Sequence, residues 1–128
     1  MKKIILVILS LVLITGCGKK EVQETIETNK VNLNELVIEE KQVNDLIFKN
    51  TSMIYEQGIT TFKTLIVNNG IDIEIKNIYI DCYSKNGLKI LTLKKEVNKV
   101  IKNKENFQIA VATDIDLTDI YEIKYNLD

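Results

Sequence analysis

The stretch that decides the fold is 71–83, which reads IDIEIKNIYIDCY. Isoleucines at positions 71, 73 and 75 alternate with polar residues, and this alternation is typical of a strand with one buried face. Beyond Asn77 the apolar positions move to 78, 80 and 82. A shift of one residue would turn the buried face to the opposite side of the strand. We therefore predict a bulge or a kink near Lys76 and Asn77.

Strand signals continue on both sides of this stretch. Asn86-Gly87 predicts a hairpin that joins it, antiparallel, to the run 88–93. Upstream, Glu56-Gln57-Gly58 predicts a turn between two β-rich runs, 46–55 and 59–67. The polar residues 50–52 split the first of these runs into two short strands or mark an irregularity within one.

Two more alternating runs, 107–112 and 121–127, predict the last strands. Residues 93–101 fit either a strand or a short helix, because Leu93, Val97 and Val100 also have helical spacing. About six to seven strands, with turns every 10 to 15 residues, are typical of a small all-β, antiparallel sandwich. We expect this sandwich to span residues 45–128.

The amino terminus reads as a secretory leader. Lys2 and Lys3 precede an apolar run, 4–14, and small residues follow it. The alternative, a transmembrane helix, is too short, because eleven residues give roughly 16 Å of helix against a hydrocarbon core of about 30 Å.

The end of the leader, Ile14-Thr15-Gly16-Cys17, resembles the lipobox of bacterial lipoproteins. The resemblance implies cleavage after Gly16 and attachment of diacylglycerol to the Cys17 thiol, and it leaves open whether the new amino terminus is also acylated. Two acyl chains hold a protein stably on a membrane. The expected location is therefore the extracytoplasmic face of a bacterial cell membrane.

These signals divide the chain into a signal peptide (1–16), a lipidated amino terminus with a polar tether (17–44) and the sandwich (45–128). The tether region is rich in Lys, Glu, Gln, Thr and Asn. Near its end, Leu33, Leu36 and Val37 fit a short helix behind Asn32 or Asn34, and 36–38 also fits a first strand.

Composition excludes several kinds of site. Without the leader the chain keeps 15 Lys against 18 acidic residues, a net charge of about −3, which disfavours nucleic acid and anionic lipid as partners. The sequence contains no Arg and no His, so the commonest general base and metal ligand are absent. We expect no enzyme activity, no catalytic residues, no metal site and no cofactor.

Two groups of acidic residues and one cysteine are candidate sites. Asp114, Asp116 and Asp119 offer the carboxylates that Ca²⁺ prefers, but the spacing lacks the Gly and distal Glu of an EF-hand, which favours turn chemistry. A second group of acids, Asp72, Glu74 and Asp81, could be imagined as a glycosidase pair, yet the alternation puts the first two on a solvated face. The remaining thiol, that of Cys82, falls on the apolar face of its strand, where we expect a buried small hydrophobe.

The order of turns and strands over 45–128 resembles the FxLYD-type and related immunoglobulin-like domains of bacterial exported proteins. At the positions that this family fills with Phe, Leu, Tyr and Asp, the chain has Ile80, Cys82, Tyr83 and Ser84. The resemblance implies an immunoglobulin-like sandwich and carries no activity with it.

The expected function is that of a membrane-anchored, non-enzymatic lipoprotein. Its sandwich would bind an envelope protein or a wall polymer through loops or an exposed edge strand. The alternative is an accessory module that presents a ligand or an ion to a membrane transporter.

Overall fold

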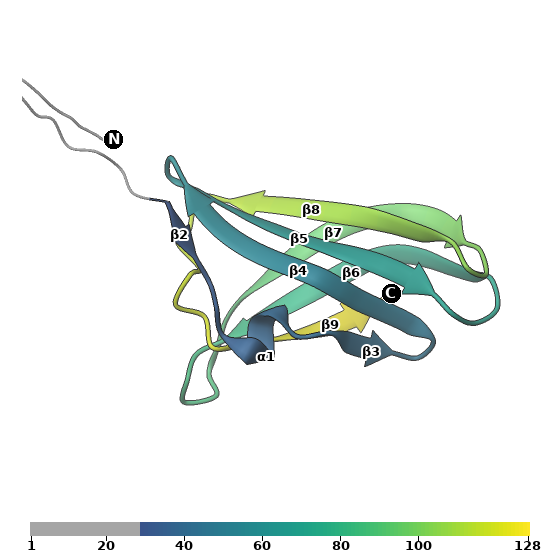
Figure 1. Ribbon diagram of the computed structural model, residues 1–128, viewed down its shortest axis with the longest axis horizontal. Helices are drawn as coiled ribbons and strands as arrows, with labels where there is room; N and C mark the ends of the chain where they lie inside the picture. Colours follow the sequence, from purple (N-terminus) through teal and green to yellow (C-terminus); the bar gives the residue numbers. More distant parts are fainter. Residues whose placement is uncertain (1–28) are drawn as a thin grey trace, which may run out of the picture.

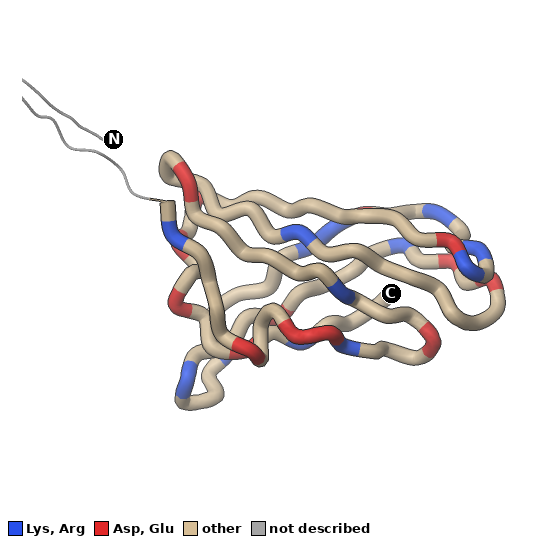
Figure 2. The backbone as a smooth tube through the Cα atoms, viewed as in Figure 1, with Lys and Arg blue, Asp and Glu red and all other residues tan. Residues whose placement is uncertain are grey.

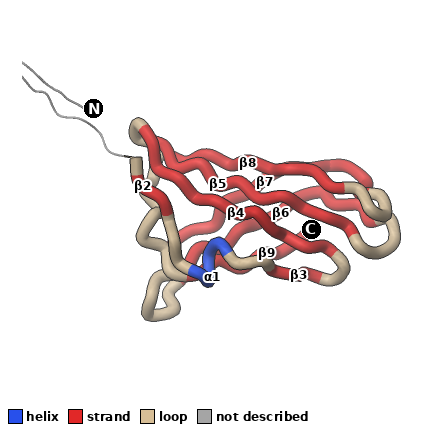
Figure 3. The backbone as a smooth tube through the Cα atoms, in the orientation of Figure 1, coloured by secondary structure: helices blue, strands red, loops and turns tan. Residues whose placement is uncertain are grey.

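Antiparallel strands form most of the part of the chain that the structure, a computed structural model, describes: residues 29–128 (Figures 1 and 3). The first sheet is built on β4 (Leu46–Glu56), β5 (Ile59–Asn68) and β8 (Asn106–Thr113), in that order. Two short strands, β2 (Lys30–Val31) and β3 (Lys41–Val43), both pair with β4.

The second sheet has three strands, in the order β7 (Lys89–Ile101), β6 (Ile73–Tyr83) and β9 (Glu122–Leu127). The two sheets face each other as a sandwich (Figure 1). Their strand order corresponds to strands A, B and E of one immunoglobulin sheet and strands C′, C and F of the other. The predicted all-β antiparallel sandwich is thus confirmed.

The core lies between the sheets and takes apolar side chains from both. Every long strand contributes, and β6 supplies four residues with at most 1% of their surface exposed. The buried hydrophobic residues are Val37, Leu46, Phe48, Met53, Phe62, Ile66, Ile75, Ile78, Ile80, Cys82, Leu93, Ile101, Ile109, Leu117, Ile120, Ile123 and Tyr125.

The predicted irregularity in β6 is confirmed. The register between β6 and β7 shifts between Ile75 and Asn77. On the other side, Asp128 accepts a backbone hydrogen bond from Lys76 (3.0 Å) but donates one to Asn77 (3.0 Å), so two residues of β6 share one partner. This extra residue lets Ile75 and Ile78 enter the same core.

The hairpins also form where the sequence predicts them. Gln57 and Gly58 both have positive φ, 54° and 81°, as a tight two-residue turn between β4 and β5 requires. Strand β4 is continuous, and its polar segment is an irregularity, since the register shifts between Lys49 and Ser52. Residues 93–101 belong to β7, so the helical alternative for them is wrong.

The amino-terminal segment differs from the prediction. Residues up to 44 are predicted as a tether, whereas 30–43 form β2, the short helix α1 (Glu35–Ile38) and β3. The helix behind Asn34 is one of the two predicted alternatives for this stretch, and the other, a strand over 36–38, is wrong. Asn32 is 0% exposed, and its amide donates to the carbonyls of Leu117 (3.1 Å) and Ile120 (2.8 Å). A buried amide therefore ties this segment to the loop before β9, and residues 30–43 are part of the folded domain.

Tyr125 is the aromatic centre of the core. Its ring stacks on Phe48, with the centroids 4.0 Å apart, and lies 6.3 Å from Phe62. Burial raises the pKa of the Tyr125 hydroxyl, and the nearby Thr64 and Thr51 hydroxyls offset part of this effect. Those two hydroxyls bond to each other at 2.8 Å, and the Tyr125 hydroxyl has no hydrogen-bond partner in the described part of the chain.

We predict that Tyr125→Phe leaves the free energy of unfolding unchanged or raises it, because the buried hydroxyl that it removes has no hydrogen-bond partner among residues 29–128. Tyr125→Ala should lower it by about 3 kcal/mol or more, since the stacked ring is lost. Urea unfolding of both variants measures the difference. The more exposed Tyr121, changed to Phe, is the matched control, and a clear loss of stability in Tyr125→Phe would contradict the prediction.

Candidate functional site

The one site residue that the sequence predicts, the lipid-bearing Cys17, lies outside the described residues. The described part contains no helix of the length and apolarity needed to cross a membrane. Within that part, loops gather at the two ends of the sandwich.

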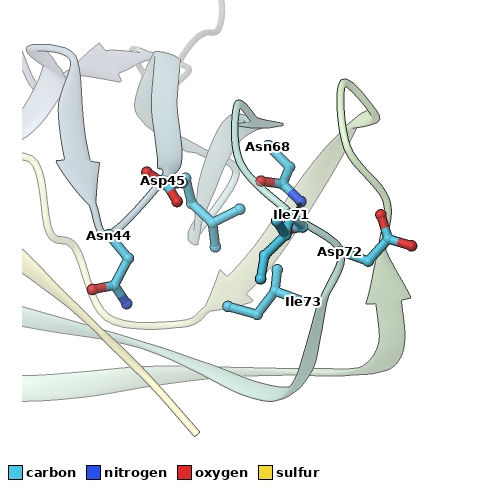
Figure 4. A pocket seen from close by; sticks show the side chains of 7 residues that line it. Asn44, Asp45, Asn68, Ile71, Asp72 and Ile73 are labelled. Atoms are coloured by element: carbon cyan, nitrogen blue, oxygen red, sulfur yellow. Dashed lines mark hydrogen bonds between the residues drawn. The ribbon is translucent and has the colours of Figure 1, made fainter.

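A hollow opens at the end formed by the β3–β4 turn and the β5–β6 loop (Figure 4). Its volume is about 240 Å³. Figure 4 shows Ile71 and Ile73 side by side, while Asp72 between them points away. The hollow is lined by Asn44, Asp45, Leu46, Asn68, Ile71, Asp72 and Ile73.

Asn68 holds the shape of the β5–β6 loop. This residue is buried, and its amide nitrogen donates to the carbonyls of Ile71 and Ile101, both at 2.9 Å. Its amide oxygen accepts from the backbone N–H of Gly70 at 2.8 Å. All three bonds satisfy buried polar groups, so the last residue of β5 fixes the loop that follows it.

Gly70 fixes the distance between the two loops. A Cβ atom at this position would lie 2.3 Å from Oδ2 of Asp45 and 2.5 Å from its Cβ. The backbone N–H of the neighbouring Asn69 donates to the carbonyl of Asp45 at 2.9 Å. Only a residue without a side chain allows this approach, which brings the Asp45 carboxylate to the rim of the hollow.

The β7–β8 loop braces the same end. The backbone N–H of Asn103 donates to Oδ1 of Asp72 (2.9 Å), and its side-chain amide donates to the carbonyl of Gly70 (2.5 Å). Three loops are therefore joined by hydrogen bonds around the hollow. Such bracing favours a preformed binding surface.

The chemistry of the hollow is mixed. Ile71 was predicted on the buried face of the strand, but it precedes β6 and is 84% exposed. Asp45 adds a carboxylate at the rim of this apolar surface, whereas the Asp72 side chain points away and accepts from Asn103 N–H. An apolar group that carries a positive charge, such as an amine, suits these walls better than an anion does.

The acidic loop before β9 shows turn chemistry at Asp116. Its carboxylate accepts from Thr118 N–H (3.0 Å), Thr118 hydroxyl (2.6 Å) and Lys30 ammonium (2.8 Å). These contacts, first that of Lys30 and then those of Thr118, lower the pKa of Asp116 to about 2. Among residues 29–128, no cluster of three acidic, Cys or His side chains could hold a metal ion.

Asp72 and Asp81, candidates for a glycosidase pair, lie far from each other. Asp81 is buried in the second sheet, where it accepts from Thr92 on β7 (2.6 Å) and Asn126 on β9 (2.5 Å). Asp72 immediately precedes β6, at the other end of the strand, roughly 30 Å away. Asp81 therefore joins the three strands of its sheet and makes no pair with Asp72.

Cys82 is a buried small hydrophobe, as expected. Its side chain is 0% exposed, and burial, with a smaller effect of Asp81, raises the pKa of the thiol to about 12. The thiol is protonated at neutral pH and enclosed by the core, so it is not a reactive site.

Sequence reasoning identified 68–70 only as a break between strands and did not anticipate the hollow. The available signal was the combination of Asn68-Asn69-Gly70 with an apolar residue, Ile71, immediately after it. Exposed apolar residues in a loop that glycine shapes can mark a contact surface.

No protein-family model matches the sequence, and no curated protein matches it. Among solved structures, the fold is similar to the crystal structure of a DUF1425 family member from Shewanella sp. pv-4. The match covers 77% of this chain and 94% of that one, with 8% identity and a TM-score of 0.43. A similarity of this size carries neither a family assignment nor a function.

We predict that Gly70→Ala lowers the free energy of unfolding by about 1 to 3 kcal/mol, because the added Cβ collides with Asp45. Asp45→Gly removes the colliding atoms, so the double variant should recover most of the loss. A double-mutant cycle by urea unfolding measures this coupling. Additive losses in the cycle would show that the two residues do not constrain each other.

Proposed function

We propose that this chain is a membrane-anchored, extracytoplasmic lipoprotein whose sandwich is a non-enzymatic binding domain for an envelope protein or a wall polymer. The observation that carries the proposal is the position of the hollow. It lies at the end of the sandwich opposite the end where the chain enters.

The anchor is supported by the leader and by the lipobox-like Ile14-Thr15-Gly16-Cys17. The resemblance of 45–128 to FxLYD-type domains of exported proteins is consistent with the same location. If Cys17 bears diacylglycerol, the folded domain is held on the membrane by the residues that precede Lys30.

The two ends of the sandwich then have different surroundings. Lys30 pairs with Tyr55, next to the β4–β5 turn, whereas Leu46 pairs with Asn68 beside the hollow. Strand β5 connects these ends with ten residues, which correspond to roughly 30 Å. The hollow therefore lies far from Lys30, at the other end of the sandwich (Figure 1), and an anchor at Cys17 would leave it free for a partner.

The lining of the hollow supports a specific kind of contact. Ile71 and Ile73 would pack against an apolar group of the partner, while the Asp45 carboxylate at the rim would attract a positive charge beside it. The absence of His from the sequence supports a binding role over a catalytic one.

The anchor is tested with Cys17→Ala in cells that are fed a labelled fatty acid. We expect the unmodified chain to carry the label and to fractionate with membranes. The variant should lose the label, because the acceptor thiol is gone, and should stay uncleaved or be released. Cys82→Ala is the matched control and should keep full labelling. Unchanged labelling of Cys17→Ala would overturn the anchor.

The binding end is tested by crosslinking the full chain in its own membranes and isolating it. Ile71→Lys should reduce the recovered partner about tenfold, because it places a cation where a cation of the partner would bind. Ile115→Lys is the matched control, since Ile115 is also exposed (49%) but lies in the loop after β8, at the end of the sandwich where Lys30 enters. Equal recovery from both variants, or none above background from the unmodified chain, would contradict the proposal.

A further inference from the structure

Strand β8 is an unusual edge strand because it carries no charge. Its sequence is NFQIAVAT, and its one strand neighbour in the described structure is β5. Figure 2 shows β8 without a Lys or an acidic residue along its length. An uncharged edge with high β propensity is open to pairing with another strand.

The hydrogen-bonding direction of β8 follows from its neighbour. Asn68 N–H donates to the carbonyl of Glu105 at 3.0 Å, just before β8 begins. The N–H and C=O of one strand residue point to the same side, and successive residues alternate. Residues 107, 109, 111 and 113 therefore point to β5, and Asn106, Gln108, Ala110 and Ala112 point outward.

These outward backbone groups have no partner in the described part of the chain. The register of β8 with β5 has no irregularity from Asn106 to Thr113, so the alternation holds along the strand. No described residue hydrogen-bonds to the outward N–H or C=O of Asn106, Gln108, Ala110 or Ala112.

The other edges carry features that discourage pairing. Strand β7 bears Lys89, Lys94, Lys95 and Lys99, and Asn98 interrupts it with a φ of 49°. Strand β9 has six residues, and α1 packs against it. The edge beside β4 is divided between β2 and β3, with two and three residues. Lysines, short strands and irregularities are the usual protections of a sheet edge, and β8 lacks them.

We propose that β8 pairs with β8 of a second copy of this chain, antiparallel, with the two-fold axis at Ile109. In this register Asn106 lies opposite the partner copy's Ala112, and Gln108 lies opposite its Ala110. All outward groups of both strands are then used, in about eight hydrogen bonds. A shift by two residues would leave some of them unpaired.

The same register improves the packing of side chains. Phe107 and Val111 are half-buried and pack on the core, and self-pairing places Phe107 of one copy opposite Val111 of the other. Apolar pairs of this type stabilise a sheet.

Charge does not oppose a second copy. Nothing charged on β8 is brought against its like, and the nearest pair, Lys99 and Glu105, is already joined at 2.7 Å. Because a two-fold pair uses both edges at once, the assembly closes at two copies.

The test uses two full-length chains with different tags, expressed together, one with Gln108→Cys and the other with Ala110→Cys. Mild oxidation of the intact cells should link the two tags, because opposite residues of a hydrogen-bonded pair have Cα atoms about 5.5 Å apart. Two chains that carry the cysteine at the same position should link at least fivefold less. The Cα atoms of these two cysteines lie about 9 Å apart, diagonally across the strand pair. Parent chains and Ile90→Cys on β7 are the controls.

Introducing charges at positions 108 and 110 checks the register without relying on a disulfide between these two positions. One chain carries Asn106→Cys with Gln108→Lys, and the other carries Ala112→Cys with Ala110→Lys. The two cysteines report pairing, and the two lysines lie opposite each other in the proposed register. We expect about a tenfold loss of linkage, and Gln108→Glu in place of Gln108→Lys should restore it. These positions are exposed, so the fold of each copy is retained.

The proposal is overturned if the Gln108→Cys and Ala110→Cys chains do not link, or if identical variants link equally well. Linkage of either cysteine to a different protein also overturns the proposal and would indicate that β8 pairs with a strand of that protein. None of these readouts involves the hollow or the lipid, so the proposed function can fail while self-pairing holds, and the reverse.

Discussion

The fold depends on one constraint within β6: residues on both sides of Lys76 must point into the same core. Ile75 precedes the irregularity, and Ile78, Ile80 and Cys82 follow it with the opposite phase. Without an extra residue, one of these two sets would face solvent. Because β6 is the central strand of its sheet, the irregularity also sets the register of β7 and β9. The position of Tyr125 against Phe48 follows from that register.

Buried amides and hydroxyls impose a second constraint, at the ends of the sandwich. Asn32 joins the entering chain to the loop before β9, and the Thr60 hydroxyl donates to the carbonyl of Ile115 in the same loop (2.7 Å). Asn68 does the equivalent at the far end, with Ile101 and Gly70 as its partners. Each of these groups would be costly to bury without a partner, so each specifies one loop conformation. Strand pairing determines the sandwich, and these buried polar side chains determine the conformations of the loops at its ends.

Much of the sheet structure could be predicted, because the period of two and the turn residues are local signals. Consecutive residues signal the register shift at Lys76 and the hairpins at Gln57-Gly58 and Asn86-Gly87. Residues 30–43 could not be placed in the same way. Their composition is that of a solvated linker, and what holds them is the contact of Asn32 with carbonyls more than 80 positions away. Helical spacing over 93–101 was misleading, because pairing with β6 decides the conformation there.

The hollow was beyond sequence reasoning for the same physical reason. Its walls come from two loops, and the close approach of Gly70 to Asp45 depends on the pairing of β4 with β5 rather than on either loop alone. Asn-Asn-Gly reads as a turn whether or not a second loop lies against it. The edge strand β8 is the converse case. Its lack of charge is visible in the sequence. Only the sheet order shows that its outward N–H and C=O groups have no partner among residues 29–128, and only the bond from Asn68 to Glu105 shows which residues carry them. Local pattern thus predicts elements, whereas surfaces for partners arise where distant elements meet or where a sheet ends.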